Sequence, residues 1–311
     1  MKKWNYIDSI YYTVRLTLSK KYISEPFLFK ILFLYLGLIK LYIIKKVNMD
    51  SNTIYETILL EIEGRVAKVT LNRPDVHNAF NNILINDLYD VFEKLSTEPE
   101  IRVIILTGNG KSFCAGADLN WMKSVVNYSY EQNYEESLKL AKLMYLIFTH
   151  PKPVIARING SAIGGGVGLM SVCDILIANE EAKFGLSEVK LGLVPAAISP
   201  FVMSRIGDAR ARELFITGER ITAKRAEYLN LVNYAVPMSE IDILVNEKVN
   251  LILNNGPEAV RSVKEMIFKV TQIKFPEIQT YTAELIANLR LSAEGQEGMN
   301  AFLEKRKPKW S

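Results

Sequence analysis

The feature that most constrains this chain is a run of three consecutive glycines at residues 164–166, inside an otherwise apolar segment. Residues 153–158 read PVIARI, which is typical of a buried strand, and residues 167–170 read VGLM, which can begin a buried helix. Because glycine has no Cβ, a ligand can lie directly against main-chain N–H groups. A strand, a glycine turn and a helix N-terminus together predict a place where negative charge is stabilised.

A second loop of the same kind lies upstream. Residues 108–119 read GNGKSFCAGADL and follow the strand candidate VIILT at residues 103–107. Two glycine loops that end strands could each present one N–H group to the same oxygen. This is the geometry of an oxyanion hole, in which each donor contributes about 3 kcal/mol to transition-state stabilisation.

At these residues the chain resembles the crotonase (enoyl-CoA hydratase/isomerase) superfamily. Residues 111–119 are similar to the first CoA-ester loop of that family, and residues 155–175 are similar to its signature. Further similar segments occur, in family order, at residues 71–80, 184–195 and 298–308.

The resemblance implies an α/β, crotonase-like (ClpP/crotonase) fold, a spiral of ββα units followed by C-terminal helices that mediate trimers or dimers of trimers. The residues themselves favour a β/α core. They predict a hairpin of residues 55–60 and 66–71 and helices at 82–95 and 133–149, with an almost entirely helical pattern after about residue 198. We therefore expect a core with the CoA-ester site at residues 49–245 and a trimerisation region at residues 246–311.

Residues 1–48 lie outside the resemblance and carry a net charge of +7, whereas the remainder carries −3. Residues 27–44 read FLFKILFLYLGLIKLYII and are apolar except at Lys30 and Lys40. Three interpretations stay open: a translation start assigned too early, with Met49 as the initiator, a membrane-proximal helix, or a targeting segment. We expect a cytoplasmic protein that touches a membrane only if residues 27–44 do so.

The composition excludes several other classes of protein. The two cysteines, Cys114 and Cys173, lack a CxxC partner, which excludes a disulfide scaffold and indicates a reducing compartment. The two histidines, His77 and His150, do not have metal-ligand spacing, so we expect no metal site and interpret both as loop residues. The mildly acidic body gives no reason to expect nucleic-acid binding.

The resemblance implies the catalytic groups. The N–H groups of Ala117 and Gly165 would hold the thioester oxygen, and Glu188 would transfer protons. A carboxylate in an apolar pocket has a raised pKa, which suits acid/base catalysis near neutrality. For Asp118 a helix cap is the favoured interpretation. Gly168 is a departure, because two-glutamate hydratases carry a second carboxylate there, whereas family isomerases keep one glutamate. This weakens the prediction of ordinary hydration without abolishing it.

The resemblance also implies the contacts with CoA, which enters as part of the substrate, so no separate cofactor is expected. The tail residues would reach the CoA of a neighbouring subunit; the other interpretation of that tail is a solvated basic segment. The predicted substrate- and CoA-binding residues are Asp75, Val76, His77, Ala115, Gly116, Asp118, Leu119, Gly164, Phe302 and Lys305.

Residues 164–169 and 187–202 resemble the branch of methylglutaconyl-CoA and isohexenylglutaconyl-CoA hydratases. Hydration of 3-methylglutaconyl-CoA, a step of leucine catabolism, is therefore the leading prediction. The distal carboxylate of that substrate could either help to position water or require a cationic partner, for which Arg157, Lys190 and Arg205 are candidates by their proximity in the sequence.

Three alternatives remain. A Δ3,Δ2-enoyl-CoA isomerase or an acyl-CoA decarboxylase would use the same site. RNA binding is disfavoured because residues 135–143, EESLKLAKL, set two lysines beside two glutamates. A non-catalytic scaffold is disfavoured because Glu188 and both glycine loops are present.

Overall fold

The computed structural model describes residues 55–310. The predictions for the N-terminal extension, including residues 27–44 and Met49, fall outside these residues. Residues 55–310 belong to one compact unit. Within residues 55–310, no helix combines the length and the apolar character that a bilayer crossing requires.

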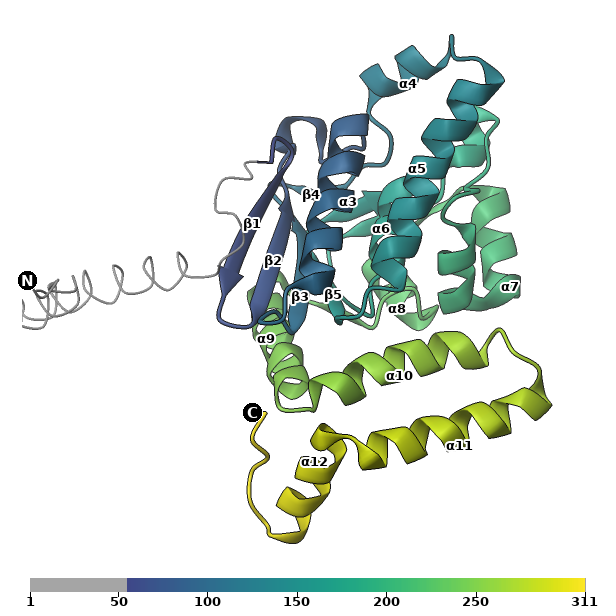
Figure 1. Cartoon of the computed structure of the whole chain (residues 1–311). Helices are drawn as coiled ribbons and strands as arrows, with labels where there is room; N and C mark the ends of the chain where they lie inside the picture. Colours follow the sequence, from purple (N-terminus) through teal and green to yellow (C-terminus); the bar gives the residue numbers. More distant parts are fainter. Residues whose placement is uncertain (1–54, 311) are drawn as a thin grey trace, which may run out of the picture. The chain divides into compact units, whose positions relative to one another are not determined.

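The larger of two sheets begins with the predicted hairpin and continues with parallel strands (Figure 1). The hairpin strands pair from Ile58 with Leu71 to Glu63 with Val66, so the predicted hairpin forms, with its turn at Gly64-Arg65 and its first strand three residues later than predicted. In spatial order, the strands are β1 (Ile58–Glu63), β2 (Val66–Leu71), β3 (Val103–Gly108), β5 (Val154–Ile158), β7 (Ile175–Asn179) and β10 (Tyr234–Val236).

A smaller sheet of three-residue strands lies beside it. Its first three strands are parallel, and the fourth pairs antiparallel with the third. These strands were not predicted, since three residues are too few to show alternation. In spatial order they are β4 (Ser112–Cys114), β6 (Ser161–Ile163), β8 (Lys183–Gly185) and β9 (Arg220–Thr222).

Both long helices predicted in the core are confirmed, with bounds set by their caps. The Asn81 side chain accepts the Leu84 N–H and starts α3 (Asn82–Thr97). Ser129 and Gln132 form a capping box that starts α5 (Tyr130–Phe148), so this helix begins before the predicted residue 133. The other helices of the core are α4 (Leu119–Val125), α6 (Gly165–Ser171), α7 (Ser199–Thr217), α8 (Ala223–Tyr228), α9 (Met238–Leu253) and the 3-10 turns η1 (Pro74–Val76) and η2 (Glu188–Leu191).

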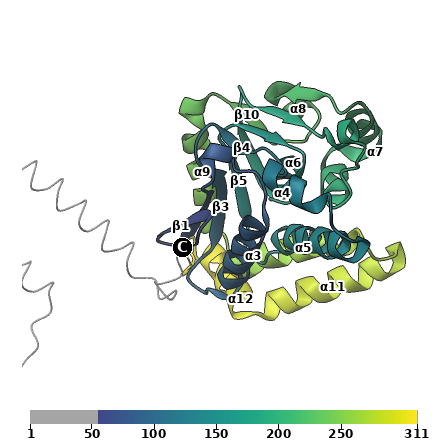
Figure 2. The same cartoon turned by 90° about the horizontal axis from the view of Figure 1, so that it is seen from above.

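Helix α9 covers one face of the larger sheet, while α3 and α5 lie on the other side (Figure 2). Ile241, Val245 and Val249 repeat every four residues and so share one side of α9. They pack on Val103, Ile155 and Ile177, which come from three neighbouring parallel strands. Burial of each such side chain contributes about 1.5–3 kcal/mol.

The chain after α9 consists of three helices that contact one another, α10 (Pro257–Val270), α11 (Phe275–Leu291) and α12 (Ala293–Leu303). No residue of α11 is buried. The predicted helical character after residue 198 is correct except at β9 and β10. The predicted boundary at residues 245/246 falls inside α9, and the division into a core and a trimerisation region stays a prediction.

Candidate active site

The three predicted catalytic residues follow three adjacent parallel strands of the smaller sheet. Ala117 comes three residues after β4, Gly165 two residues after β6, and Glu188 three residues after β8. Strands β4, β6 and β8 are neighbours in that order. Adjacent strands lie about 4.8 Å apart, so the carboxyl ends of these strands hold the three segments side by side.

The first segment is fixed by a bridge between Phe80 and Ala117. The Phe80 N–H donates to the Gly116 carbonyl at 2.6 Å, and the Asp118 N–H donates to the Phe80 carbonyl at 2.9 Å. This pair of hydrogen bonds does not use the Ala117 N–H. Gly116 has φ +88°, and a Cβ there would lie 2.8 Å from the Ile163 carbonyl oxygen and 3.7 Å from the Gly165 nitrogen. The first glycine loop therefore lies directly against the second.

The second segment requires glycine for two reasons. Gly164 has φ +53° and ψ −122°, a conformation that side chains disfavour. A Cβ on Gly166 would lie only 2.2 Å from the Cys114 carbonyl oxygen, so the two loops interlock through bare backbone. Gly165 begins α6, and its N–H therefore has no acceptor within the helix.

Glu188 begins η2 and reaches back over the second loop. Its Oε1 lies 3.1 Å from the position that a Cβ on Gly164 would take. Its Oε2 is buried and has no hydrogen-bond partner among the described residues. Burial raises the pKa of this carboxyl, and a hydrogen bond from its own backbone opposes the rise only in part. An unpaired carboxylate with a raised pKa can both accept and return a proton near neutrality.

Asp118 has a different environment. Its carboxylate accepts the N–H of Asn120 at 2.7 Å and of Trp121 at 3.4 Å, which confirms the predicted cap of α4. Burial alone would raise its pKa, but the hydrogen bonds from Arg73 and from these two N–H groups outweigh it and lower the pKa. Asp118 is therefore held ionised and supports the loop.

Gly168 lies one turn beyond Gly164 on α6 and is covered by an isoleucine. A Cβ on Gly168 would lie 2.1 Å from Cγ2 and 2.6 Å from Cβ of Ile198. The place where the resemblance led us to look for a second carboxylate is thus filled by an apolar side chain. Ile198 itself is 2% exposed.

Two buried asparagines hold the first glycine loop, and the sequence analysis assigned them no role. Asn78 accepts the Arg73 N–H at 2.9 Å and donates to the Ser112 carbonyl at 2.9 Å. Asn159 accepts the Gly108 N–H at 3.1 Å and donates to the Gly110 carbonyl at 2.9 Å. For Asn159 the signal was its position between a buried strand and Gly160, because a buried amide must satisfy both its donor and its acceptor.

Several predicted CoA-binding residues adjoin this loop. Asp75 and Val76 lie in η1, and His77 follows it. The His77 carbonyl accepts the Ala115 N–H at 3.0 Å, and its Nδ1 lies 3.0 Å from the Ser112 hydroxyl. This turn is therefore attached to the first glycine loop, which ends at the exposed Leu119.

Phe302 and Lys305 lie at the other end of the chain. Phe302 is in α12 and is 83% exposed, and Lys305 follows that helix. Helix α12 packs on α10 and α11. The role of both residues at a neighbouring subunit's CoA stays a prediction.

Two of the three cations proposed for a distal carboxylate are engaged elsewhere. Arg157 forms an ion pair with Asp242 at 2.6 Å. Arg205 donates to the Ser171 carbonyl at 3.1 Å, at the opposite end of α6 from Gly165. Lys190, in η2, is exposed and lies two residues after Glu188.

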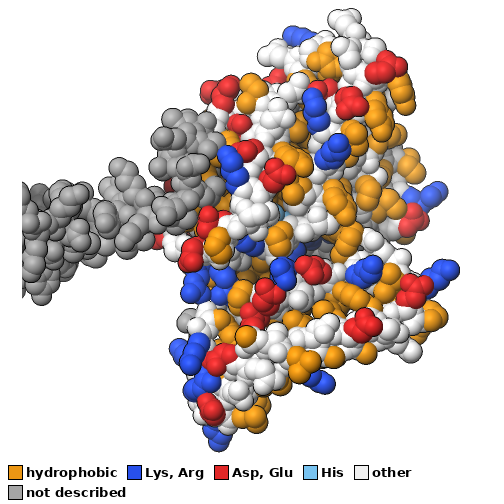
Figure 3. All heavy atoms as spheres, in the orientation of Figure 1, with side chains coloured by type: hydrophobic (Ala, Val, Ile, Leu, Met, Phe, Trp, Pro, Cys, Tyr) orange, Lys and Arg blue, Asp and Glu red, His pale blue; other side chains and the backbone are white. Residues whose placement is uncertain are grey.

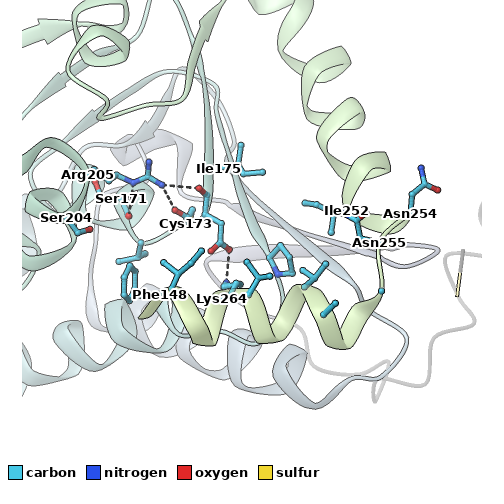
Figure 4. Close-up of a pocket in the computed structure, with 18 of the residues that line it drawn as sticks. Phe148, Ser171, Cys173, Ile175, Ser204, Arg205, Ile252, Asn254, Asn255 and Lys264 are labelled. Carbon is cyan, nitrogen blue, oxygen red and sulfur yellow. Dashed lines mark hydrogen bonds and ion pairs between the residues drawn. The ribbon is translucent and has the colours of Figure 1, made fainter. Parts of the chain in front are cut away.

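A cavity of about 760 Å³ also lies at that opposite end of α6 (Figure 4). Arg205 lines it, and Lys264 forms an ion pair with Asp174 there at 2.7 Å. Apolar side chains such as Val263 and Ile267 of α10 complete the wall. Neither Glu188 nor either of the two proposed N–H donors borders this cavity, so it is distinct from the candidate active site.

The chain is similar in sequence and in structure to several known proteins. A family model described as enoyl-CoA hydratase/isomerase matches residues 61–311. A short-chain-enoyl-CoA hydratase of Clostridium acetobutylicum is 36% identical over 256 residues, which cover 80% of this chain and 95% of the relative. A solved enoyl-CoA hydratase from Shewanella pealeana has a TM-score of 0.80 at 38% identity, covering 82% of this chain and 96% of that one. A solved putative enoyl-CoA hydratase/isomerase (crotonase) from Legionella pneumophila has a TM-score of 0.77 at 46% identity, covering 82% of this chain and 99% of that one.

Proposed function

Because the chain belongs to the enoyl-CoA hydratase/isomerase family, we propose that it adds water to the double bond of an enoyl-CoA thioester. The observation that carries this proposal is Glu188, whose buried Oε2 has no partner among the described residues and whose Oε1 lies over Gly164. The names of similar proteins, among them the short-chain hydratase of Clostridium acetobutylicum, support hydration as the reaction type.

In the proposed reaction Glu188 carries the proton in both directions. Its carboxylate takes a proton from water while the water oxygen forms a bond to the β-carbon. The π electrons move toward the thioester oxygen, and the N–H groups of Ala117 and Gly165 hold the resulting enolate. The protonated Glu188 then gives its proton to the α-carbon, which restores the carboxylate and completes the addition of water. Each N–H donor would contribute about 3 kcal/mol.

The use of one carboxylate for both steps has a stereochemical consequence. Ile198 fills the space over Gly168, so no second acidic side chain can stand there. The hydroxyl group and the proton would therefore reach the same face of the double bond, which is a syn addition.

We propose 3-methylglutaconyl-CoA as the substrate, with hydration as a step of leucine catabolism. The support comes from the resemblance of residues 164–169 and 187–202 to that branch. It also comes from Lys190, an exposed cation close in sequence to Glu188 that could meet a distal carboxylate. Arg157 and Arg205 no longer compete for this role, because both are engaged by other groups.

A Δ3,Δ2-enoyl-CoA isomerase is the second candidate, and the single carboxylate favours it. Glu188 would then take a proton from one carbon and return it to another, with no water added. RNA binding loses support, because Lys139 of the lysine-containing helix α5 is paired with Glu136 at 2.9 Å.

We also propose that α10–α12 mediate assembly into trimers or dimers of trimers. Phe275, Leu291 and Phe302 are 77%, 80% and 83% exposed, and an exposed apolar patch is typical of a protein–protein contact. Figure 3 shows hydrophobic side chains among the charged ones along α10 and α11. Light scattering at several protein concentrations tests this, and a monomer throughout would contradict it.

The function is tested by turnover of the full chain with 3-methylglutaconyl-CoA and crotonyl-CoA side by side. Glu188→Gln should lower kcat by at least about 100-fold, since it removes the proton carrier. Glu181→Gln is the matched control, because Glu181 is exposed in the turn before β8. Formation of an isomer without hydration would favour the second candidate. Hydration that persists in Glu188→Gln would contradict the assignment of Glu188.

A further inference from the structure

We propose that Ile198 determines the acyl-chain length that this site accepts. The side chain sits on Gly168 and closes the inner end of the acyl site, so that short acyl groups are favoured over long ones. This inference rests on the proposed function, because it places the acyl group between Glu188 and α6.

The first step is the position of Ile198 relative to Glu188. Residues four apart on an α-helix lie on the same side, about one turn or 5.4 Å from each other. Gly164 precedes α6 with a non-helical backbone, but its carbonyl accepts the Gly168 N–H at 3.3 Å, so the two residues lie one helical turn apart. Glu188 covers Gly164, and Ile198 covers Gly168. Ile198 therefore lies about one helical turn further along α6 than the carboxylate does.

The second step is the closeness of the contact. Any side chain at position 168 would begin 2.1 Å from Ile198 Cγ2, which is inside van der Waals contact. Only glycine lets the isoleucine pack so deeply on the helix. Ile198 and Gly168 thus form a complementary pair that leaves no room between α6 and the start of α7.

The third step is the rigidity of this wall. The Ile198 carbonyl accepts the N–H of Phe201 at 3.2 Å and of Val202 at 3.2 Å, which binds its backbone to the first turn of α7. Ile198 is 2% exposed, and α6 and α7 contact each other. A longer acyl chain could not push the side chain aside without moving α7.

The fourth step is chemical. The Ile198 side chain has no hydrogen-bonding group, so it cannot help to hold a water molecule, which needs two to four polar partners. A charged end of the acyl group would lose its hydration against this wall. A distal carboxylate would therefore turn away from Ile198, toward the exposed side of η2.

The test measures binding of saturated analogues by calorimetry, so it does not depend on turnover. Full-length wild-type protein, Ile198→Val and Ile198→Ala are titrated with butyryl-CoA and octanoyl-CoA. Truncation to alanine should shift the affinity ratio toward octanoyl-CoA by about 10-fold or more, with a smaller shift for valine, because each methylene of space is worth about 10-fold or more. Leu214→Ala is the matched control, since Leu214 is a buried residue of α7 that is 3% exposed.

A second measurement is needed if Ile198→Ala is too destabilised for the ratio of its octanoyl-CoA and butyryl-CoA affinities to be measured. The pair predicts that Gly168→Ala lowers the melting temperature of wild-type protein more than it lowers that of Ile198→Ala, because truncation removes the closest clashing atom, Cγ2 at 2.1 Å, and leaves only Cβ at 2.6 Å. An unchanged affinity ratio in folded Ile198→Ala would overturn the proposal. If no enoyl-CoA is hydrated but the ratio shifts as expected, the proposed reaction fails while the role of Ile198 stands.

Discussion

The guanidinium of Arg73 lies 2.8 Å from the carboxylate of Asp118, and the two side chains are only 18% and 6% exposed. Arg73 also donates to the Ala79 carbonyl, next to the bridge between Phe80 and Ala117. One ion pair therefore connects the turn after β2 with the N-terminus of α4. Ala117, the first proposed oxyanion donor, lies between the two attached segments, next to Asp118 in the chain and opposite Phe80 in the bridge.

Substitution of Asp118 should separate its two roles. Asp118→Asn keeps a good helix cap but removes the charge, whereas Asp118→Ala removes both. We expect Asp118→Asn to lower the free energy of unfolding by about 3 kcal/mol, because it leaves the buried Arg73 unpaired, and Asp118→Ala to lower it by about 1 kcal/mol more. Urea denaturation at pH 7 measures both. Equal stability of wild-type protein and Asp118→Asn would show that the ion pair does not stabilise the fold.

The raised pKa of Glu188 should reduce stability at neutral pH. The folded state holds this proton more tightly than the unfolded chain, so stability falls as pH rises from the ordinary glutamate pKa to the raised one. Glu188→Gln should therefore be more stable than wild-type protein at pH 7 and closer to it at pH 4. Thermal unfolding at the two pH values checks this, with Glu181→Gln as the control. A variant less stable than wild type at pH 7 would contradict it.

Gly164→Ala should disturb both the backbone and the carboxylate. The new Cβ would lie 3.1 Å from Glu188 Oε1, and the alanine would have to adopt a φ of +53°, which side chains disfavour. We expect kcat to fall by at least about 10-fold, since small displacements of catalytic groups are costly. Gly64→Ala is the matched control, because Gly64 has φ +57° but no neighbour within 4 Å of the added atom. Both variants should lose stability, and only Gly164→Ala should lose activity.

His150 should make the fold sensitive to acid. It is 1% exposed, and its Nε2 lies 3.1 Å from the Phe92 carbonyl. Burial lowers its pKa to about 4. The unfolded chain therefore binds an extra proton between about pH 6.5 and pH 4, and stability falls by up to about 3 kcal/mol as pH drops through that window. The difference between the urea midpoints at pH 7 and pH 4.5 should be smaller for His150→Gln than for the control His77→Gln, which alters an exposed histidine.

The two thiols should be unreactive in the folded protein. Burial raises the pKa of Cys114 to about 12 and that of Cys173 to about 12 as well, so hardly any thiolate is present at pH 7. An aromatic disulfide reagent should label both cysteines quickly in urea and neither one without it. Fast labelling of the native protein would show that this part of the core opens.

The parts of the site whose conformation is determined by residues close in sequence could be predicted from the sequence. Gly164, Gly166 and Gly116 are required by positive φ angles or close backbone contacts, and both glycine loops were predicted. The cap at Asp118 was also predicted, because the N–H groups that it accepts lie only two and three residues further along the chain. The smaller sheet was missed, because its three-residue strands gain stability from their neighbours and not from their own pattern.

Contacts between distant residues could not be predicted. Ile198 lies thirty positions after Gly168, and no local rule links an isoleucine to a remote glycine. Arg157 and Arg205 were chosen for their charge and their position in the sequence. Their actual partners, Asp242 and the end of α6, depend on the packing of α9 and α7.

The order β4, β6, β8 has a consequence for how such a site can change. The proposed charge-stabilising groups are backbone atoms, and the ladder of main-chain hydrogen bonds sets their spacing. The acyl group, in contrast, meets side chains such as Ile198, which substitution alters freely. A descendant of this protein could therefore acquire a new substrate by exchanging a few side chains while inheriting the same means of stabilising an enolate.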